Sequence, residues 1–390
     1  MEEWKEYKLG DVAKLTTGFP FDGHKYSKEG IRVVRGDNVT IGSLRWDSDK
    51  DKRWGENFDR ASEFALYDGD IVIGMDGSRV GKNRAQVKQY DLPLLIAQRV
   101  ACVRHNELST QQFLYYHIFS DRFEKYIKAV QTGTSIPHVS LKQIGDFPLI
   151  IPSIKTQDKI ASILKSLDDK IEVNKRINEN LEQQAQALFK SWFVDFEPFK
   201  NGEFVESELG RIPKGWRVGT FGEIMTIASG KRPPKKESSF SHECNIPLVG
   251  ASDIMGYTNS VLFNEDILVT GRVGTHGIVQ RFNYPCWPSD NTLVLKSDYY
   301  EYCYQILCSI DYASLNRGST QPLITQTDIN NQIILIPPYS VLSDFEKYAS
   351  TLMKAKENNQ RSSHRLAELR DTLLPKLMSG ELKVNEINAI

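Results

Sequence analysis

The sequence has no long apolar run. No stretch approaches the roughly 18 apolar residues that a membrane-spanning helix needs. The first residues, Met-Glu-Glu-Trp-Lys, are charged and lack the apolar core of a secretory signal. We therefore expect a cytoplasmic protein with no membrane partner. At 390 residues, 40% hydrophobic and 25% charged, the chain has an ordinary globular composition and enough length for two domains.

The chain is also poor in residues that bind metals or form redox pairs. Its five cysteines are odd in number and include no Cys-x-x-Cys pair, which favours buried or free thiols over a disulfide framework. Its seven histidines show no metal-ligand spacing. The sequence therefore predicts no metal site and no cofactor.

Net charge is nearly absent, at −1, and by itself this argues against nucleic acid as a partner. The charge is unevenly distributed, however. Residues 79–104 hold six basic residues against one acidic residue, and residues 211–236 hold seven against one. Local basic stretches are what phosphate binding requires, although most charge runs are simply solvated faces. One such stretch in each half of the chain favours DNA binding.

What the sequence does contain is a duplication. Residues 4–18 align without gaps on residues 216–230, with a tryptophan and two glycines at identical positions. Three further segments repeat in the same order: 67–73 on 263–269, 133–139 on 318–324, and 147–152 on 332–337. The second and fourth of these four segments are apolar and β-branched, which predicts buried strands. Two copies indicate two domains that recognise two similar targets, rather than one catalytic cleft.

A heptad pattern follows each β-rich half. In the first, the seam positions are 160, 164, 167, 171, 174, 178, 181, 185, 188 and 192, and the same pattern recurs 185 residues later. This spacing predicts two long helices that pack against each other as an antiparallel coiled coil. Asn174 and Asn359 occupy equivalent seam positions, where a buried asparagine would fix the register. The alternative is that each helix packs only on its own domain.

These patterns predict an α+β protein in which two β-rich domains are joined and braced by the helices. The predicted boundaries are a first recognition domain over 1–152, a helical spacer over 153–198, a second recognition domain over 199–338 and a second helical spacer over 339–390.

Three segments resemble catalytic signatures only in part. Ile336-Pro-Pro-Tyr339 has isoleucine where adenine methyltransferases place a polar residue, so it predicts a strand end before a helix. The segment 77–83 has too few residues between its glycines for a phosphate loop, and asparagine replaces the magnesium-binding hydroxyl. The segment 271–277 is glycine-rich but precedes no helix pattern. We therefore predict no catalytic residues.

The ordered set of repeated segments resembles the specificity (S) subunit of type I restriction-modification systems over essentially the whole chain. The marks are the two Trp-x-x-x-x-(Leu/Phe)-Gly-(Asp/Glu) segments, the two Gly-(Thr/Ser)-(Ser/Thr)-x-Pro segments, and the helix ends over 188–199 and 373–384. No single motif is decisive.

The resemblance implies a non-catalytic subunit in which each half reads one part of a split site in double-stranded DNA. It implies that the paired helices set the gap between the two parts and dock two methyltransferase subunits, with restriction subunits completing the complex. We expect Trp192, Phe193 and Phe196 to face a methyltransferase subunit rather than their own core. Half-sites about 10 bp apart would match one turn of DNA.

Candidate DNA contacts follow from side-chain chemistry, because cations hold phosphates while arginine and amide side chains read guanine and adenine edges. The candidates for phosphate binding are Lys82, Arg84, Lys231, Arg232, Lys235 and Lys236. The candidates for base reading are Arg79, Gln98, Arg99, Arg272, His276, Asn291, Arg317 and Gln321. Thr134, Ser135, Ser319 and Thr320 lie on the paired glycine loops, where they would contact the DNA backbone or cap a turn.

Two other functions remain open from the sequence. A self-sufficient DNA methyltransferase or nuclease would need the isolated chain to bind S-adenosylmethionine. The other is a non-catalytic coiled-coil adaptor that binds only protein, and any affinity of such a protein for DNA would not fall as the salt concentration rises.

Overall fold

The computed structural model describes residues 4–55, 60–133, 135–315 and 323–384. The chain forms two compact units, and each combines one β-rich half with one end of both long helices. The first unit is Met1–Glu172 with Ser363–Ile390, and the second is Val173–Ser362. Part of each long helix therefore belongs to each unit.

The first unit is built on two four-stranded sheets and a strand pair. One sheet is antiparallel, in the order β2 (Ala13–Thr17), β9 (Val100–His105), β6 (Ile71–Gly74) and β7 (Arg84–Gln86). The other has the order β4 (Arg53–Trp54), β3 (Ile31–Val34), β8 (Leu94–Ile96) and β5 (Ala65–Leu66), and its β3–β8 pair is parallel. The antiparallel pair joins β1 (Lys5–Lys8) to β10 (Pro148–Ile151).

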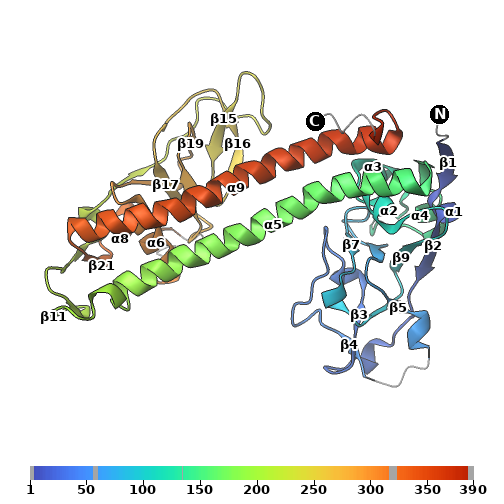
Figure 1. The fold of residues 1–390 in the computed structure, drawn as a ribbon, viewed down its shortest axis with the longest axis horizontal. Helices are drawn as coiled ribbons and strands as arrows, with labels where there is room; N and C mark the ends of the chain where they lie inside the picture. The colour runs from blue at the N-terminus through green and yellow to red at the C-terminus, as the bar shows by residue number, and fades with distance from the viewer. Residues whose placement is uncertain (1–3, 56–59, 134, 316–322, 385–390) are drawn as a thin grey trace. The chain divides into compact units, whose positions relative to one another are not determined.

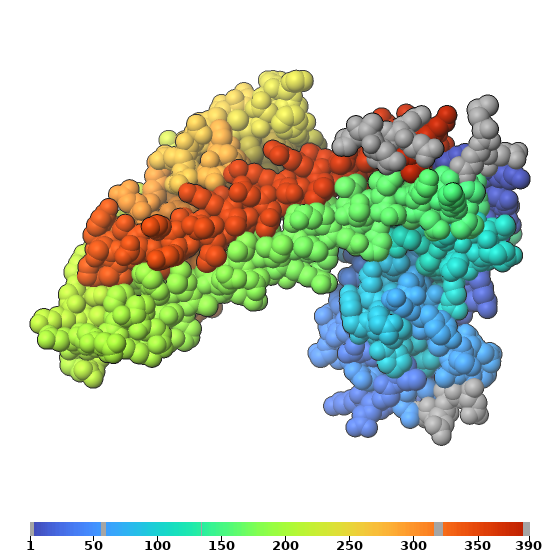
Figure 2. Space-filling view, viewed as in Figure 1, coloured from blue at the N-terminus to red at the C-terminus, as the bar shows by residue number. Residues whose placement is uncertain are grey.

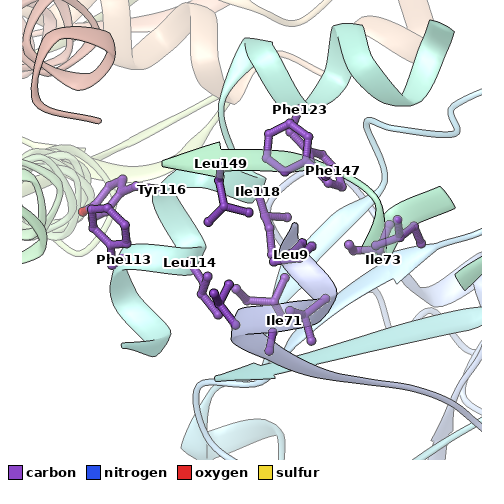
Figure 3. Packing of buried hydrophobic residues seen from close by; sticks show 14 of the residues in the cluster. Leu9, Ile71, Ile73, Phe113, Leu114, Tyr116, Ile118, Phe123, Phe147 and Leu149 are labelled. Atoms are coloured by element: carbon purple, nitrogen blue, oxygen red, sulfur yellow. The ribbon is translucent and has the colours of Figure 1, made fainter. Parts of the chain in front are cut away.

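The described part of the first unit also contains four short α-helices, and capping residues set where two of them begin. They are α1 (Leu9–Val12), α2 (Gln111–Ile118), α3 (Asp121–Val130) and α4 (Leu141–Gly145). The Ser120 hydroxyl accepts a hydrogen bond from Phe123 N at the start of α3, and Ser140 with Gln143 forms a capping box at α4. Side chains from these helices and from β6 meet in one buried apolar cluster (Figure 3).

The second unit repeats this plan. Its antiparallel sheet has the order β14 (Thr226–Ser229), β20 (Thr292–Lys296), β17 (Ile267–Gly271) and β18 (Val279–Phe282). A three-stranded sheet follows the order β16 (Ile254–Thr258), β15 (Ile246–Val249) and β19 (Trp287–Pro288), with a parallel β15–β19 pair. The remaining elements are the pairs β13 (Arg217–Thr220) with β21 (Ile333–Ile336) and β11 (Phe204–Ser207) with β12 (Gly210–Pro213), and the helices α6 (Tyr300–Ser309), α7 (Tyr312–Leu315) and α8 (Gln326–Asn330).

The strand registers correct one detail of the repeat. Leu15 pairs with Val103, and Ile71 also pairs with Val103. In the second unit Ile227 pairs with Leu295, whose other partner is Leu268. Ile71 therefore corresponds to Leu268, one residue beyond the position that the sequence alignment of 67–73 with 263–269 gave. The other repeated pairings keep the predicted alignment: Lys5 with Ile151 corresponds to Arg217 with Ile336.

The two long helices, α5 (Ile154–Phe193) and α9 (Tyr339–Ser379), are 40 and 41 residues long. They lie side by side within each unit (Figures 1 and 2). In the second unit the rings of Phe193 and Phe345 are 4.9 Å apart, while Glu182 is ion-paired with Lys356. From the first pair to the second, the residue number falls along α5 and rises along α9. The helices are therefore antiparallel, as predicted.

The first unit continues the same pairing. Arg370 Nη1 lies 2.7 Å from Asp168 Oδ1, and Tyr116 Oη of α2 donates to Asp168 Oδ2 at 2.8 Å. The seam asparagines differ in burial: Asn174 is 1% exposed, whereas Asn359 is half-buried. Among the described helices, none combines the length and apolarity that crossing a membrane requires.

Candidate nucleic-acid interface

Several loops of the first unit meet where the strands of both sheets end. The residue after β6, Met75, donates its backbone N–H to Arg99 O at 3.0 Å, in the loop between β8 and β9. Its own carbonyl accepts from Val139 N at 2.9 Å. The next residues form an isolated antiparallel bridge between Asp76 and His138. Three segments distant in sequence are thus held together by main-chain hydrogen bonds, and we call residues 75–76, 97–99 and 138–139 the first rim.

The second unit has the same arrangement of main-chain hydrogen bonds. Arg272 N donates to Asn291 O at 2.8 Å, and Ile324 N donates to Arg272 O at 3.0 Å. An isolated bridge joins Val273 and Leu323. We call residues 272–273, 289–291 and 323–324 the second rim. Arg99 therefore corresponds to Asn291, so the main-chain hydrogen bonds are shared while the side chains differ.

An ionic cluster occupies the first rim. Arg99 Nη1 lies 2.6 Å from Asp76 Oδ2, and His138 Nδ1 is hydrogen-bonded to the other carboxylate oxygen of Asp76. Burial acts to raise the pKa of Asp76, but the hydrogen bonds and charges of Arg99 and His138 outweigh it, so the net shift is downward. The carboxylate therefore stays charged and holds the guanidinium, while 66% of the Arg99 side chain remains exposed.

Three of the predicted base-reading residues line one surface cleft of about 830 Å³ in the first unit. These are Arg79, Gln98 and Arg99, and all three are exposed. The cleft also contains Arg35 and Arg45, which sequence reasoning missed because they lie far from the basic stretch at 79–104. In the sequence, only their positive charge indicated that these two arginines could contact DNA.

The second rim contains two predicted residues, and a third, His276, lies beside it. Arg272 is half-buried, Asn291 is exposed, and His276 Nδ1 lies 3.3 Å from Gly271 O. Beside them, Lys231 N donates to Pro288 O, and its carbonyl accepts from Trp287 Nε1 at 2.7 Å. These contacts fix the Lys231 backbone next to the second rim.

One of the two phosphate binders predicted in the first basic stretch is buried, and the other is exposed. Arg84 is 7% exposed, its guanidinium lies against the Phe119 and Phe123 rings, and burial lowers its pKa. Its Nη2 approaches Phe119 O at 3.4 Å, so the prediction that Arg84 binds phosphate is wrong, since this side chain packs in the interior. Lys82 remains exposed, with its Nζ 3.7 Å from Glu124 Oε1.

The second basic stretch is partly neutralised. Lys235 Nζ lies 3.1 Å from Glu237 and 2.7 Å from Glu243, and these carboxylates raise its pKa. Within the described ranges no ion pair is recorded for Lys231, Arg232 or Lys236, and all three are exposed. They retain the free positive charge that phosphate binding needs.

The paired glycine loops are described only in part. Ser135 is exposed beside Ile136, which lines the cleft of the first unit. The predicted contacts at Thr134, Arg317, Ser319, Thr320 and Gln321 lie outside the described residues.

The aromatic end of α5 packs mainly inside the second unit. Phe193 is 4% exposed and its ring lies 4.7 Å from that of Tyr302, so the prediction that it faces a partner instead of its own core is wrong. It completes an apolar core between the two helices and α6. Trp192 and Phe196 are half-buried at the edge of this core and keep exposed surface.

The partial catalytic signatures have structural roles. β21 ends at Ile336 and α9 begins at Tyr339, so Pro337 and Pro338 mark a strand exit, as predicted. The segment 77–83 is a turn followed by a strand, and no helix follows Gly271 directly. Over the described residues, no group of three or more histidine, cysteine or acidic side chains is placed to hold a metal ion. All five cysteines are free thiols, and four of them are buried.

Comparisons with known proteins agree with this architecture. The family model of the type I restriction modification DNA specificity domain matches residues 1–183 and 213–360. The MjaIX type I restriction enzyme specificity subunit of Methanocaldococcus jannaschii is 32% identical, over 71% of this chain and 70% of that protein. The HindI specificity subunit of Haemophilus influenzae is 24% identical, over 98% of this chain and 100% of that protein.

A solved structure shows the same fold. The S subunit of a type I restriction-modification system from M. genitalium superposes with a TM-score of 0.62 at 17% identity, and the match covers 97% of this chain and 96% of that one. The family model accounts for most of both halves, and the match with the HindI subunit covers nearly the whole chain. The chain therefore belongs to the family of type I restriction modification DNA specificity domains, with a matched region in each half.

Proposed function

We propose that this chain is the DNA sequence-specificity subunit of a type I restriction-modification complex. The observation that carries the proposal is the duplicated rim. Two units hold loops from distant segments on the same main-chain hydrogen bonds, yet present different side chains there. A protein that reads two different parts of one DNA site needs this combination of a common backbone and divergent base-contacting groups.

In this proposal the first unit reads one half-site and the second unit reads the other. Arg79, Gln98 and Arg99 reach base edges from the first unit, and Arg272, His276 and Asn291 do so from the second. Lys231, Arg232 and Lys236 bind phosphates. Support comes from the exposure of Lys231, Arg232 and Lys236 and from the place of Lys231 beside the second rim. In the first unit, support comes from the cleft that Arg79, Gln98 and Arg99 share.

The chain acts without its own catalysis and directs a separate methyltransferase subunit. Trp192 and Phe196 are proposed docking residues, because both are aromatic and partly exposed. Two methyltransferase subunits and the restriction subunits then complete the complex. Substitution of each residue by alanine, with co-purification of the methyltransferase subunit as readout, tests the docking role against a merely structural one measured by thermal unfolding.

Co-expression with the host methyltransferase subunit, followed by mapping of methylated adenines in genomic DNA, tests the function. We expect a split motif that appears only when both chains are present. Methylation by this chain alone would instead favour a self-sufficient methyltransferase. A chain that forms a complex but directs no motif would act as a protein adaptor.

The helices are proposed to set the gap between the half-sites. Insertion of one heptad, about seven residues, beside Ile171 and beside its seam partner Leu366 preserves the packing pattern of both helices. At about 1.5 Å per residue and about 3.4 Å per base pair, the gap should widen by about 3 bp while both half-sites stay unchanged. An unchanged gap with the methylation activity intact would contradict this role.

A further inference from the structure

The arginine in the ionic cluster of the first rim has an unusual backbone conformation. Arg99 is a non-glycine residue with a φ of +67°, a left-handed conformation that such residues adopt rarely. Strained backbone of this kind persists where the surroundings over-determine it, and it is frequent at functional sites. Here the main-chain bond from Met75 N and the ion pair with Asp76 hold the residue on both sides.

Asp76 uses both of its oxygens in this cluster. Oδ2 accepts from Arg99 Nη1 at 2.6 Å, and Oδ1 is hydrogen-bonded to His138 Nδ1. The Asp76 side chain is 23% exposed, against 66% for Arg99, so the carboxylate lies deeper than the guanidinium that it holds. His138 thus fixes the carboxylate, and the carboxylate fixes the arginine.

The free donors of Arg99 point to its ligand chemistry. A guanidinium has five N–H donors in a planar fork, and the Asp76 contact is the only hydrogen bond recorded for the Arg99 side chain within the described residues. The paired acceptors that match such a fork in the major groove are O6 and N7 of guanine. A guanidinium already held in place loses less freedom on binding than a free one, which sharpens its discrimination.

We propose that Arg99 reads a guanine in the half-site of the first unit, and that Asp76 is the residue that positions it, with His138 supporting Asp76. The assignment rests on the proposed function. Arg79 lines the same cleft but has no ion-pair partner among the described residues, so it lacks this pre-organisation. The second rim carries Val273, Asn291 and Leu323 at the corresponding positions, so it has no equivalent of the cluster.

Motif mapping with the complete methyltransferase complex tests the assignment. We expect the wild-type chain to require a G·C pair in the first half-site. Arg99→Lys keeps the charge and loses the fork, so it should relax the preference at that pair by about 5- to 150-fold. Asp76→Asn should weaken the preference at the same pair, and in both variants the second half-site should stay unchanged.

Two controls separate reading from folding. Arg60→Lys is the matched change, because Arg60 is an exposed arginine of the first unit that is held by Glu63 at 2.7 Å but does not line the cleft, and it should leave the G·C requirement intact. Retention of the second half-site shows that each variant folds and assembles. A variant-free measurement replaces that guanine with 7-deazaguanine, which lacks the N7 acceptor, and should weaken binding of the wild-type complex.

Distinct results would overturn the two proposals. The assignment of Arg99 would be refuted if the first half-site required no G·C pair. It would also be refuted if every G·C requirement of that half-site persisted in Arg99→Lys. Loss of the guanine requirement in Arg79→Lys but not in Arg99→Lys would transfer the role to Arg79. A preference unaffected by Asp76→Asn would refute the positioning role. A wild-type complex that directs no split motif would instead overturn the proposed function, and this assignment with it.

Discussion

Gly18 and Gly230, two of the residues that reveal the duplication, lie where two backbone segments approach each other closely. A Cβ on Gly18 would lie 2.0 Å from Ile96 O and 2.4 Å from the carbonyl carbon of Ala97. A Cβ on Gly230 would lie 2.2 Å from Ser289 O. Real Cβ atoms essentially never come within 3.0 Å of such atoms, so each position requires glycine for lack of space. We predict that Gly18→Ala displaces the neighbouring loop of the first rim.

The size of the effect follows from this geometry. The Ile96 carbonyl oxygen must move away by about 1 Å, and hydrogen bonds couple this movement to the neighbouring residues. Phe19 N donates to Ile96 O at 3.0 Å, and Gln98 N donates to Phe19 O at 2.9 Å. Overpacking of a rigid site costs about 1–3 kcal/mol. For a unit of this size, this corresponds to a melting temperature lower by roughly 2–12 °C.

The assay compares wild type, Gly18→Ala and Gly23→Ala by thermal unfolding and by motif mapping. Gly23 is the matched control, because a Cβ there meets nothing within 4 Å. Gly18→Ala should lower the melting temperature and degrade recognition of the first half-site, because Gln98 and Arg99 follow the displaced carbonyl. A Gly18→Ala chain as stable and as selective as Gly23→Ala would refute the reasoning.

Three further predictions concern burial and charge. Phe193→Ala should lower the free energy of unfolding of the second unit by about 3–5 kcal/mol, measured by urea denaturation; a loss as small as that of a surface change would contradict its place in the core. Burial raises the pKa of Glu346 to about 7, although Glu301 N and Tyr302 N donate hydrogen bonds to its carboxylate. The stability that the protonated Glu346 side chain contributes should therefore be full below about pH 4.5 and lost as the pH rises through about 7. Glu346→Gln should flatten the difference between urea midpoints at about pH 5 and about pH 8, and an unchanged difference would exclude this group as its source. Arg84→Met should lower the free energy of unfolding and leave the salt dependence of DNA binding unchanged. Lys231→Ala should instead reduce the slope of log K against log salt by about 1. A reduced slope in Arg84→Met and an unchanged slope in Lys231→Ala would restore Arg84 as a phosphate contact.

The repeat predicted most of the fold because its marks are local. Glycines, prolines and heptads act on their own neighbourhood. The buried strands predicted at 67–73 and 147–152 overlap β6 and β10, and the two heptad patterns lie on α5 and α9. The one-residue error at β6 and β17 has a physical cause. Both strands are buried on both faces, so their apolar runs show no alternation that would fix the register.

The candidate site was harder to predict, because a basic residue in the sequence can be buried or ion-paired in the folded protein. Arg84 and Arg104 belong to the first basic stretch, yet one is buried and the other is held by the buried Asp70 at 2.6 Å. Lys235 is neutralised by two carboxylates. Asp76 and His138 were missed because their value depends on meeting Arg99 across segments far apart in the chain.

The two rims suggest how recognition changes without loss of the fold. In both units the loops are fixed by backbone hydrogen bonds, such as Met75 N to Arg99 O and Arg272 N to Asn291 O. Main-chain donors and acceptors are present whatever the side chain, so residues at these positions are released from a structural duty and can vary in chemistry. The ion pair between Asp76 and Arg99 is not required for these main-chain bonds, since the corresponding bonds form in the second unit without it, and this agrees with the binding role proposed for it. Specificity should therefore reside in the exposed side chains of the rims, while glycines at close backbone contacts, such as Gly18 and Gly230, preserve the frame that presents them.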